Sequence, residues 1–383
     1  MARRLLIVGT SDDAARAADA AQRAGIEAVV FDGAAENADE ISDAAQTHGA
    51  EGIYSAGERD AEKVAAAAQT LGFPCFSPRA ARLLRDKEAL RAVLARHTNL
   101  NPRYGAADSQ SETERALNGM GLPAVVKPAD GVGGQGASIV EEIDDAPLAF
   151  VRASKAAANG RVLIETYLRG QEFRVICHAG GGKWCTLGVF SNVPADNGHL
   201  FDRALVAPVR VAGGLRDQLS KAVQRAVRSV GRVHGVVVFE FLLSEAGLCL
   251  IELSHINTVP ELATRLFPGI CGVDLLETDV ACFAGVPPAS VLRYTSCGAL
   301  WWIHARSGVV SGVRGEDTAR AVPGIGAVGI HAKEGAVLGH QVDVASRDAA
   351  GHILALARSP RRALEKARYA AECLHIDTLA ALE

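Results

Sequence analysis

The chain has 383 residues, of which 49% are hydrophobic, and its formal net charge is −4 at pH 7. A chain of this length can bury most of the surface that it exposes when unfolded, in two or three domains. No basic excess points to nucleic acid, and no apolar run reaches the length of a membrane span. The eight cysteines are scattered singly without a CxxC pair, which is typical of reduced core residues in a cytoplasmic protein.

Residues 1–85 alternate short apolar runs with alanine-rich segments. We expect strands at 5–8, 28–31 and 52–54 and helices at 13–23 and 58–71. This alternation predicts a small doubly wound α/β domain. Ligands bind at strand ends in such sheets, and Glu58 follows the third strand. Glu58 is therefore a candidate for ligand contact, although a carboxylate is also common in the first turn of a helix.

A glycine loop within residues 122–140 separates a short strand from its return at 137–140. Gly131, Gly133, Gly134 and Gly136 tolerate positive φ angles that let backbone N–H groups surround a phosphate. Lys127, at the base of the loop, supplies a positive charge, and Ser138 supplies a hydroxyl. A flexible glycine hairpin is the alternative. The letters GxGxxG also occur, but a strand follows them instead of a helix, which argues against a dinucleotide fingerprint.

The next segment, residues 161–177, has an acidic residue at the end of one strand and another at the start of the next. Ile164 and Leu168 can lie around an adenine in this arrangement, while backbone groups beside Glu165 read the edge of the ring. Glu172 can accept hydrogen bonds from ribose hydroxyls. A solvated charge at a strand end is the commoner interpretation of such a glutamate.

Two carboxylates, Glu240 and Glu252, each interrupt an apolar run that is otherwise typical of a buried strand. A charge in such a place is costly unless it is paired or binds a metal. Residues 244–247 supply a hairpin turn, so adjacent strands can bring both carboxylates to one face. Oxygen ligands of this kind suit Mg²⁺. The alternative is a structural network in which Arg or Lys neutralises both groups.

From about residue 297 the chain changes to short strands with glycine breaks, followed by a closing helix. The strands are expected at 308–313, 323–328 and within 351–360, and the helix at 361–372. Earlier in the chain, residues 215–230 have apolar positions on one helical face and basic positions opposite. They predict an amphipathic helix that packs on a core.

Taken in order, these motifs resemble the ATP-grasp superfamily of carboxylate–amine ligases. The matching pieces are Lys87, Val126-Lys127-Pro128, the loop at 131–136, Glu165 with Gly170-Gln171-Glu172, and the pair Glu240 and Glu252. The C-terminal layout is similar to that of bacterial L-amino-acid ligases and of biotin-carboxylase-like members. The resemblance implies a doubly wound α/β domain at 1–85, an ATP-grasp domain of two α+β subdomains at 86–296, and a small α+β subdomain at 297–383.

The resemblance also implies a role for each motif. Lys87 and Lys127 are expected to contact the phosphates of ATP, with Lys127 also catalytic, and Mg²⁺ is expected at Glu240 and Glu252. The other implied ATP contacts are Gly133, Gly134, Gln135, Gly136 and Ser138 at the phosphates, Glu165, Thr166, Tyr167 and Leu168 at adenine, and Glu172 at ribose. The implied reaction transfers the γ-phosphoryl group to a carboxylate, after which an amine attacks the acyl phosphate. Products are an amide, ADP and phosphate.

One motif departs from the family pattern. The family commonly has Glu-x-Asn-x-Arg, whereas this chain has Ser254 in place of the asparagine and Ile256 in place of the arginine. A hydroxyl can still act as a hard oxygen ligand, so Ser254 stays a candidate metal ligand. The missing arginine normally holds the reacting acyl group, and we expect another cation there. The candidates are Arg203, His255 and Arg265, with Arg203 first because it follows a polar loop.

Expected partners are small-molecule carboxylate and amine substrates, with one amino acid among them, and neither nucleic acid nor a membrane. A homodimer is left open. Two other functions stay open at this point. One is an ATP-grasp ligase that acts on a phosphosugar amine or on bicarbonate, and the other is a catalytically silent ATP-binding protein.

Overall fold

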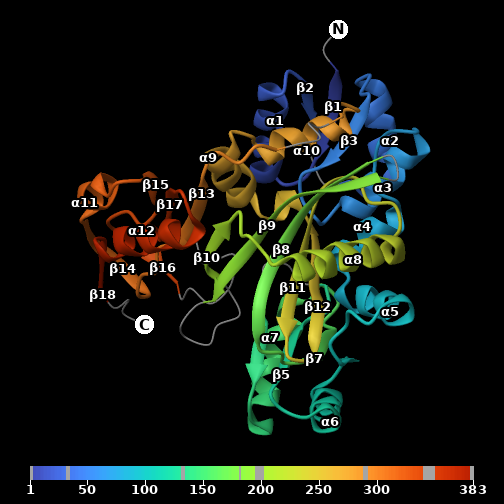
Figure 1. Ribbon diagram of the computed structural model, residues 1–383. Helices are drawn as coiled ribbons and strands as arrows, with labels where there is room; N and C mark the ends of the chain where they lie inside the picture. The colour runs from blue at the N-terminus through green and yellow to red at the C-terminus, as the bar shows by residue number, and fades with distance from the viewer. Residues whose placement is uncertain are drawn as a thin grey trace.

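The computed structural model describes residues 3–31, 35–130, 134–180, 183–194, 202–287, 292–339 and 350–379. Its first part contains β1 (Arg4–Val8), α1 (Ser11–Arg23), β2 (Glu27–Val30), α2 (Ala38–Thr47), β3 (Gly52–Ser55) and α3 (Ala61–Thr70). The three strands form a parallel sheet in the order β2-β1-β3 (Figure 1). Leu5 and Ile7 of β1 pack on the α1 side, whereas Leu6 and Val8 pack on the side of α2 and α3. Both faces of the sheet are therefore covered, as predicted.

The next sheet has four antiparallel strands in the order β4-β7-β5-β6. Its elements are β4 (Tyr104–Ala107), α6 (Gln110–Met120), β5 (Ala124–Pro128), β6 (Ser138–Val140), α7 (Ala146–Ala156) and β7 (Val162–Thr166). Both helices pack on it through a core of small and branched apolar residues. The expected return strand after the glycine loop is confirmed, because β6 pairs with β5 as a hairpin.

An eight-stranded sheet is formed by strands between residues 170 and 357, in the order β12-β11-β8-β9-β10-β13-β17-β15. Its strands are β8 (Gly170–Gly180), β9 (Lys183–Pro194), β10 (Asp202–Ala207), β11 (Gly235–Ser244), β12 (Gly247–His255), β13 (Cys297–Trp302), β15 (Ile325–Ile330) and β17 (Gly351–Ala357). Helix α8 (Gly213–Val230) buries Leu219, Val223 and Val230, which confirms the predicted amphipathic helix. Because β10 pairs with β13, the sheet continues past the predicted boundary at residue 297.

The predicted hairpin between the two carboxylates is confirmed. Strands β11 and β12 are antiparallel, and Glu240 lies directly opposite Glu252. Gly247 follows the turn with a φ of 111°, a conformation that other residues rarely adopt. The register shifts just after Glu240, at a bulge that allows the two carboxylates to stay on one face.

The last part of the chain adds a small sheet in the order β16-β14-β18 and two helices (Figure 1). These elements are β14 (Gly308–Arg314), α11 (Glu316–Ala321), β16 (Val337–Leu338), α12 (Pro360–Glu372) and β18 (His375–Leu379). Ser359 caps α12 by accepting a hydrogen bond from the backbone N–H of Arg362. The predicted strands and closing helix of this part of the chain are confirmed as β14, β15, β17 and α12: β17 lies within the predicted range, and the ends of the others are displaced by up to two residues.

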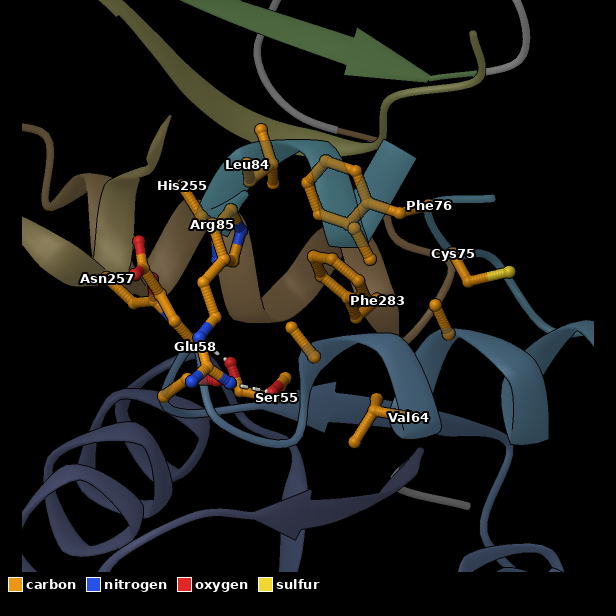
Figure 2. A pocket seen from close by; sticks show the side chains of 14 residues that line it. Ser55, Glu58, Val64, Cys75, Phe76, Leu84, Arg85, His255, Asn257 and Phe283 are labelled. Carbon is orange, nitrogen blue, oxygen red and sulfur yellow. Dashed lines mark hydrogen bonds between the residues drawn. The ribbon is translucent and has the colours of Figure 1, made fainter. Parts of the chain in front are cut away.

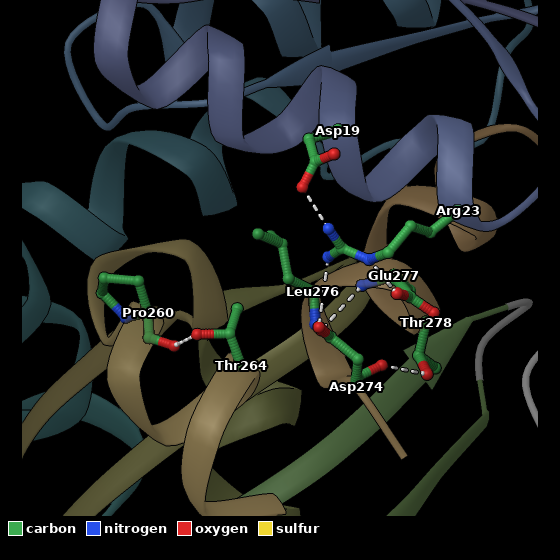
Figure 3. A network of polar contacts seen from close by, with 8 residues as sticks. All are labelled: Asp19, Arg23, Pro260, Thr264, Asp274, Leu276, Glu277 and Thr278. Atoms are coloured by element: carbon green, nitrogen blue, oxygen red, sulfur yellow. Dashed lines mark hydrogen bonds and ion pairs between the residues drawn. The ribbon is translucent and has the colours of Figure 1, made fainter. Parts of the chain in front are cut away.

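A polar network joins the N-terminal sheet to the centre of the molecule at α1 and α10 (Leu275–Phe283) (Figure 3). Arg23 of α1 pairs with Asp19 on its own helix and with Glu277 of α10. A guanidinium nitrogen of Arg23 also lies 3.2 Å from Asp274, whose side chain caps α10. These contacts hold the first domain against the sheet that carries the carboxylate hairpin.

Among the described residues, no helix is both long enough and apolar enough to cross a membrane.

Candidate active site

A cleft of about 1320 Å³ lies among the N-terminal domain, the four-stranded sheet and the β11–β12 hairpin. It brings together most of the residues that the sequence singled out as ATP or metal contacts. Those on its wall are Lys87, Lys127, Gly134, Gln135, Glu165, Thr166, Tyr167, Leu168, Glu172, Glu240, Glu252 and Ser254. Segments more than 150 positions apart in the chain therefore meet in one place, although their individual roles stay predictions.

The glycine loop is only partly described. Gly131 and Gly133 lie outside the described residues, whereas Gly134 and Gly136 have φ angles of 72° and 73°. A Cβ atom on Gly136 would come within 2.8 Å of the backbone oxygen of Arg152 on α7. Gly136 is thus required for close packing of the loop on α7. Gly136 and Ser138 are not among the described residues that line the cleft.

Lys127 and Glu165 form a buried ion pair on the floor of the cleft. The Nζ of Lys127 lies 2.7 Å from one carboxylate oxygen of Glu165, and the Nε of Arg91 lies 2.5 Å from the other. Burial alone would raise the pKa of Glu165, but the charges of Arg91 and Lys127 outweigh it and hold that pKa at about 2. Burial lowers the pKa of Lys127 despite the opposing effect of Glu165. Glu165 is therefore a fixed anion that orients Lys127.

Glu165 should contribute stability that disappears in acid. Its pKa is about 2 in the folded protein against an ordinary value near 4.5. Because this pKa is depressed, ionised Glu165 contributes about 3 kcal/mol to the free energy of unfolding above pH 4.5. The contribution is lost as the pH falls from 4.5 to 2. The urea unfolding free energies of the wild type and Glu165→Gln should therefore converge over this range. The exposed Glu62→Gln on α3 is the control, and an equally pH-dependent difference there would contradict the assignment.

Lys87 begins helix α5 (Lys87–His97) and faces the carboxylate hairpin. Asp86 caps the helix by accepting a hydrogen bond from the backbone N–H of Ala89, which fixes the direction of the first turn. The Nζ of Lys87 lies 3.0 Å from Glu252. Burial would raise the pKa of Glu252, but the adjacent ammonium of Lys87 holds it below its ordinary value. The pair thus keeps both charges in place at the edge of the cleft.

Glu240 lies on the cleft wall next to Arg174 of β8. The Nε of Arg174 lies 3.1 Å from Glu240, and another of its nitrogens lies 2.9 Å from Asp202. Burial raises the pKa of Glu240 to about 7 against the effect of Arg174, and the nearby charge of Glu252 raises it further. Such crowding of carboxylates is relieved when a cation binds between them.

The donor set fits Mg²⁺ better than a metal that needs a full set of protein ligands. No group of three or more His, Cys, Asp or Glu side chains with metal-binding geometry occurs among the described residues. Glu240 and Glu252 offer two carboxylates, and Ser254 lines the same cleft. Mg²⁺ is held in proteins by one or two carboxylates and completes its shell with water and substrate phosphate.

The three cations proposed to replace the missing arginine come from three different elements, and the structure does not place them on the cleft wall. Neither Arg203, in β10, nor Arg265, which contacts His352, is among the described residues that line the cleft. His255 ends β12, and its Nε2 lies 2.9 Å from the buried Asp279. Ile256 is fully buried. The catalytic assignment of Arg203 and His255 therefore stays a prediction, and we note that Arg85 does line the cleft.

Several polar residues that organise the site were not predicted from the sequence. Arg91 and Arg174 are both almost fully buried, and each pairs with a predicted site glutamate. Asn192 donates a hydrogen bond to Glu172 at 2.9 Å. Only Arg174 carried a signal in the sequence, since it lies two positions after Glu172 in a strand and therefore points to the same face.

The family models match most of the chain. Residues 86–287, more than half of the chain, match the carbamoyl-phosphate synthase L chain, ATP binding domain. The chain belongs to the ATP-grasp ligases. Residues 301–378 match the L-amino acid ligase C-terminal domain 2. The membership agrees with the order of motifs along the cleft and with the mixed α/β fold.

Individual relatives of this ATP-grasp chain are distant. The crystal structure of L-amino acid ligase from Bacillus licheniformis shares the fold, with a TM-score of 0.80, 17% identity, and coverage of 98% of this chain and 99% of that one. The uncharacterized protein y4rH of Sinorhizobium fredii is 25% identical over 80% of this chain and 64% of its own length. Carnosine synthase 1 of Homo sapiens is 28% identical over 61% of this chain and 30% of its own. The chain thus spans less than two thirds of these two relatives.

Proposed function

We propose that the protein is an ATP-dependent ligase that joins the carboxylate of an amino acid to an amine and releases ADP and phosphate. The observation that carries this proposal is one cleft that holds two lysines, a cross-strand pair of carboxylates and the Glu165–Leu168 segment. The match of residues 301–378 to the L-amino acid ligase C-terminal domain supports an amino acid as one substrate.

The charges on the wall suit transfer of a phosphoryl group. Lys127, held by Glu165, and Lys87, held by Glu252, present ammonium groups that neutralise the phosphates of ATP as charge shifts between them. When bound at Glu240 and Glu252, Mg²⁺ would further neutralise charge on the phosphate oxygens. The backbone at Thr166 to Leu168 binds the adenine, and Glu172, fixed by Asn192, accepts from the ribose.

In the proposed reaction a carboxylate oxygen of the substrate forms a bond to the γ-phosphorus, and the bond from that phosphorus to the bridging oxygen of ADP breaks. The nitrogen of the amine then attacks the acyl carbon, phosphate leaves, and the nitrogen loses a proton. The protein mainly positions the reactants and excludes water from the acyl phosphate.

We expect release of ADP only when an amino acid and a second amine substrate are present together with Mg²⁺-ATP. The measurement is coupled ADP detection across amino acids in pairs, with each single substrate as the control. Turnover with a phosphosugar amine and bicarbonate alone would contradict the amino-acid assignment. Binding of Mg²⁺-ATP without turnover on any pair would identify a silent binding protein, and tight binding of NAD without binding of ATP would contradict the site itself.

A further inference from the structure

A second, smaller cavity opens beside the cleft, between α3, α4 (Pro78–Arg85), the end of β12 and α10 (Figure 2). Its volume is about 30 Å³. Most of its wall is apolar, and the main contributors are Ala61, Val64, Ala65, Phe76, Leu84 and Phe283. A hollow with such a lining offers a water molecule few hydrogen-bond partners, so it favours an apolar group.

The mouth of this cavity is polar and belongs to the cleft as well. Gly57, Glu58, Arg85 and Asn257 line both spaces. Burial raises the pKa of Glu58 to about 7, and among the charges that act on it are those of Lys87 and Glu252. Lys87 and Glu252 line the same cleft, so the apolar cavity opens into the space that holds the pair that we assign to phosphoryl transfer.

Buried contacts within the protein hold the wall of the cavity at His255 and Phe76. Asp279, which is fully buried, lies 2.9 Å from His255 and accepts hydrogen bonds from the hydroxyl of Tyr54 and the backbone N–H of Val236. The ring of His255 in turn stands edge-on to the ring of Phe76, with centroids 5.3 Å apart. Such a preformed wall selects a ligand by size.

We propose that this cavity receives the short apolar side chain of the amino-acid substrate whose carboxylate reacts at Lys87 and Glu252. The inference rests on the proposed function and adds the substrate class to it. The volume admits a group of about methyl size, as in alanine, whereas a leucine or phenylalanine side chain must displace the aromatic wall. Glycine leaves the cavity empty.

The test is calorimetry of glycine, alanine and leucine on the protein saturated with Mg²⁺ and a non-hydrolysable ATP analogue. Burial of one methyl group should make alanine bind about 4-fold more tightly than glycine. Overpacking should make leucine bind at least about 5-fold more weakly than alanine. Equal affinity for glycine and alanine, or tightest binding of leucine, would overturn the inference.

Two variants of α3 separate filling of the cavity from general loss of packing. Ala65→Val adds bulk at the cavity wall, whereas Ala67→Val adds the same bulk to the core between α2 and α3. Ala65→Val should remove the preference for alanine and leave glycine binding unchanged, and Ala67→Val should keep the preference. Equal behaviour of the two variants would overturn the inference.

The ADP assay across pairs of substrates distinguishes failure of the cavity's role from failure of the ligase function. Ligase turnover without a preference for alanine over glycine would remove the role of the cavity and leave the ligase assignment standing. Absence of turnover on every pair would remove the ligase assignment and, with it, the substrate class inferred here.

Discussion

Glu252→Gln is expected to lower kcat by at least about 100-fold, the usual effect of removing one electrostatic group that stabilises a transition state. Glu252 holds Lys87 at 3.0 Å and lies opposite Glu240, so its neutralisation disturbs both the lysine that we propose binds phosphate and the proposed metal site. The fold should be nearly unaffected. Loss of the pair with Lys87 is offset by relief of the repulsion that now raises the pKa of Glu240. The measurement is ADP release under saturating substrates, with a thermal unfolding curve alongside.

The hairpin itself supplies a matched control for this experiment. Glu245 is exposed in the turn between β11 and β12. Glu245→Gln makes the same chemical change five residues or more from the carboxylate pair, which is about 16 Å along the chain at about 3.3 Å per strand residue. Its kinetics should equal those of the wild type. A kcat for Glu252→Gln within about 3-fold of the wild type, in a folded protein, would discard Glu252 from the reaction.

Local patterns made much of the site predictable from sequence. Glu240 and Glu252 interrupt apolar strands on either side of a turn. Because side chains alternate between the two faces of a strand and the turn limits the register of a hairpin, few pairings of these strands are possible. Lys127 was found in the same way, because it ends a buried strand just before a glycine loop. Each of these signals lies within about 20 residues of chain, so no knowledge of long-range pairing was needed.

Long-range pairing accounts for most of what the sequence did not predict. One example is the pairing of β10 with β13, which extends one sheet past residue 297. The two strands begin 95 positions apart, and no sequence pattern common to both predicts that they pair. The observed helix ends also differ from the predicted ones, for local reasons. Helix α3 begins at Ala61 and not at Glu58 because residues 57–60 form a turn at the cleft, and α8 includes Gly213 and Gly214 although glycine disfavours helices.

Arg91 is the clearest example of a site residue without a signal in the sequence. It lies in the middle of α5, where a basic residue is ordinarily solvated, yet only 1% of it is exposed. Its Nε pairs with Glu165, and its other two nitrogens each donate to the backbone at 2.7 Å, to the oxygens of Leu250 and Ile251. Arg91 thus ties α5 to β12, immediately before Glu252, and also holds the anion that orients Lys127.

Arg91→Met should therefore destabilise the protein by about 3–5 kcal/mol, the usual cost of removing one partner from a buried ion pair. The methionine fills similar space but leaves Glu165 with Lys127 alone and removes one donor from each of two backbone oxygens. The measurement is the urea unfolding free energy at pH 7, with Arg96→Met on the exposed face of α5 as the control. Arg91→Lys should recover only part of the loss, because an ammonium cannot reproduce the three-way fork of the guanidinium. Equal stability of Arg91→Met and Arg96→Met would mean that the Arg91 contacts do not hold the helix to the hairpin.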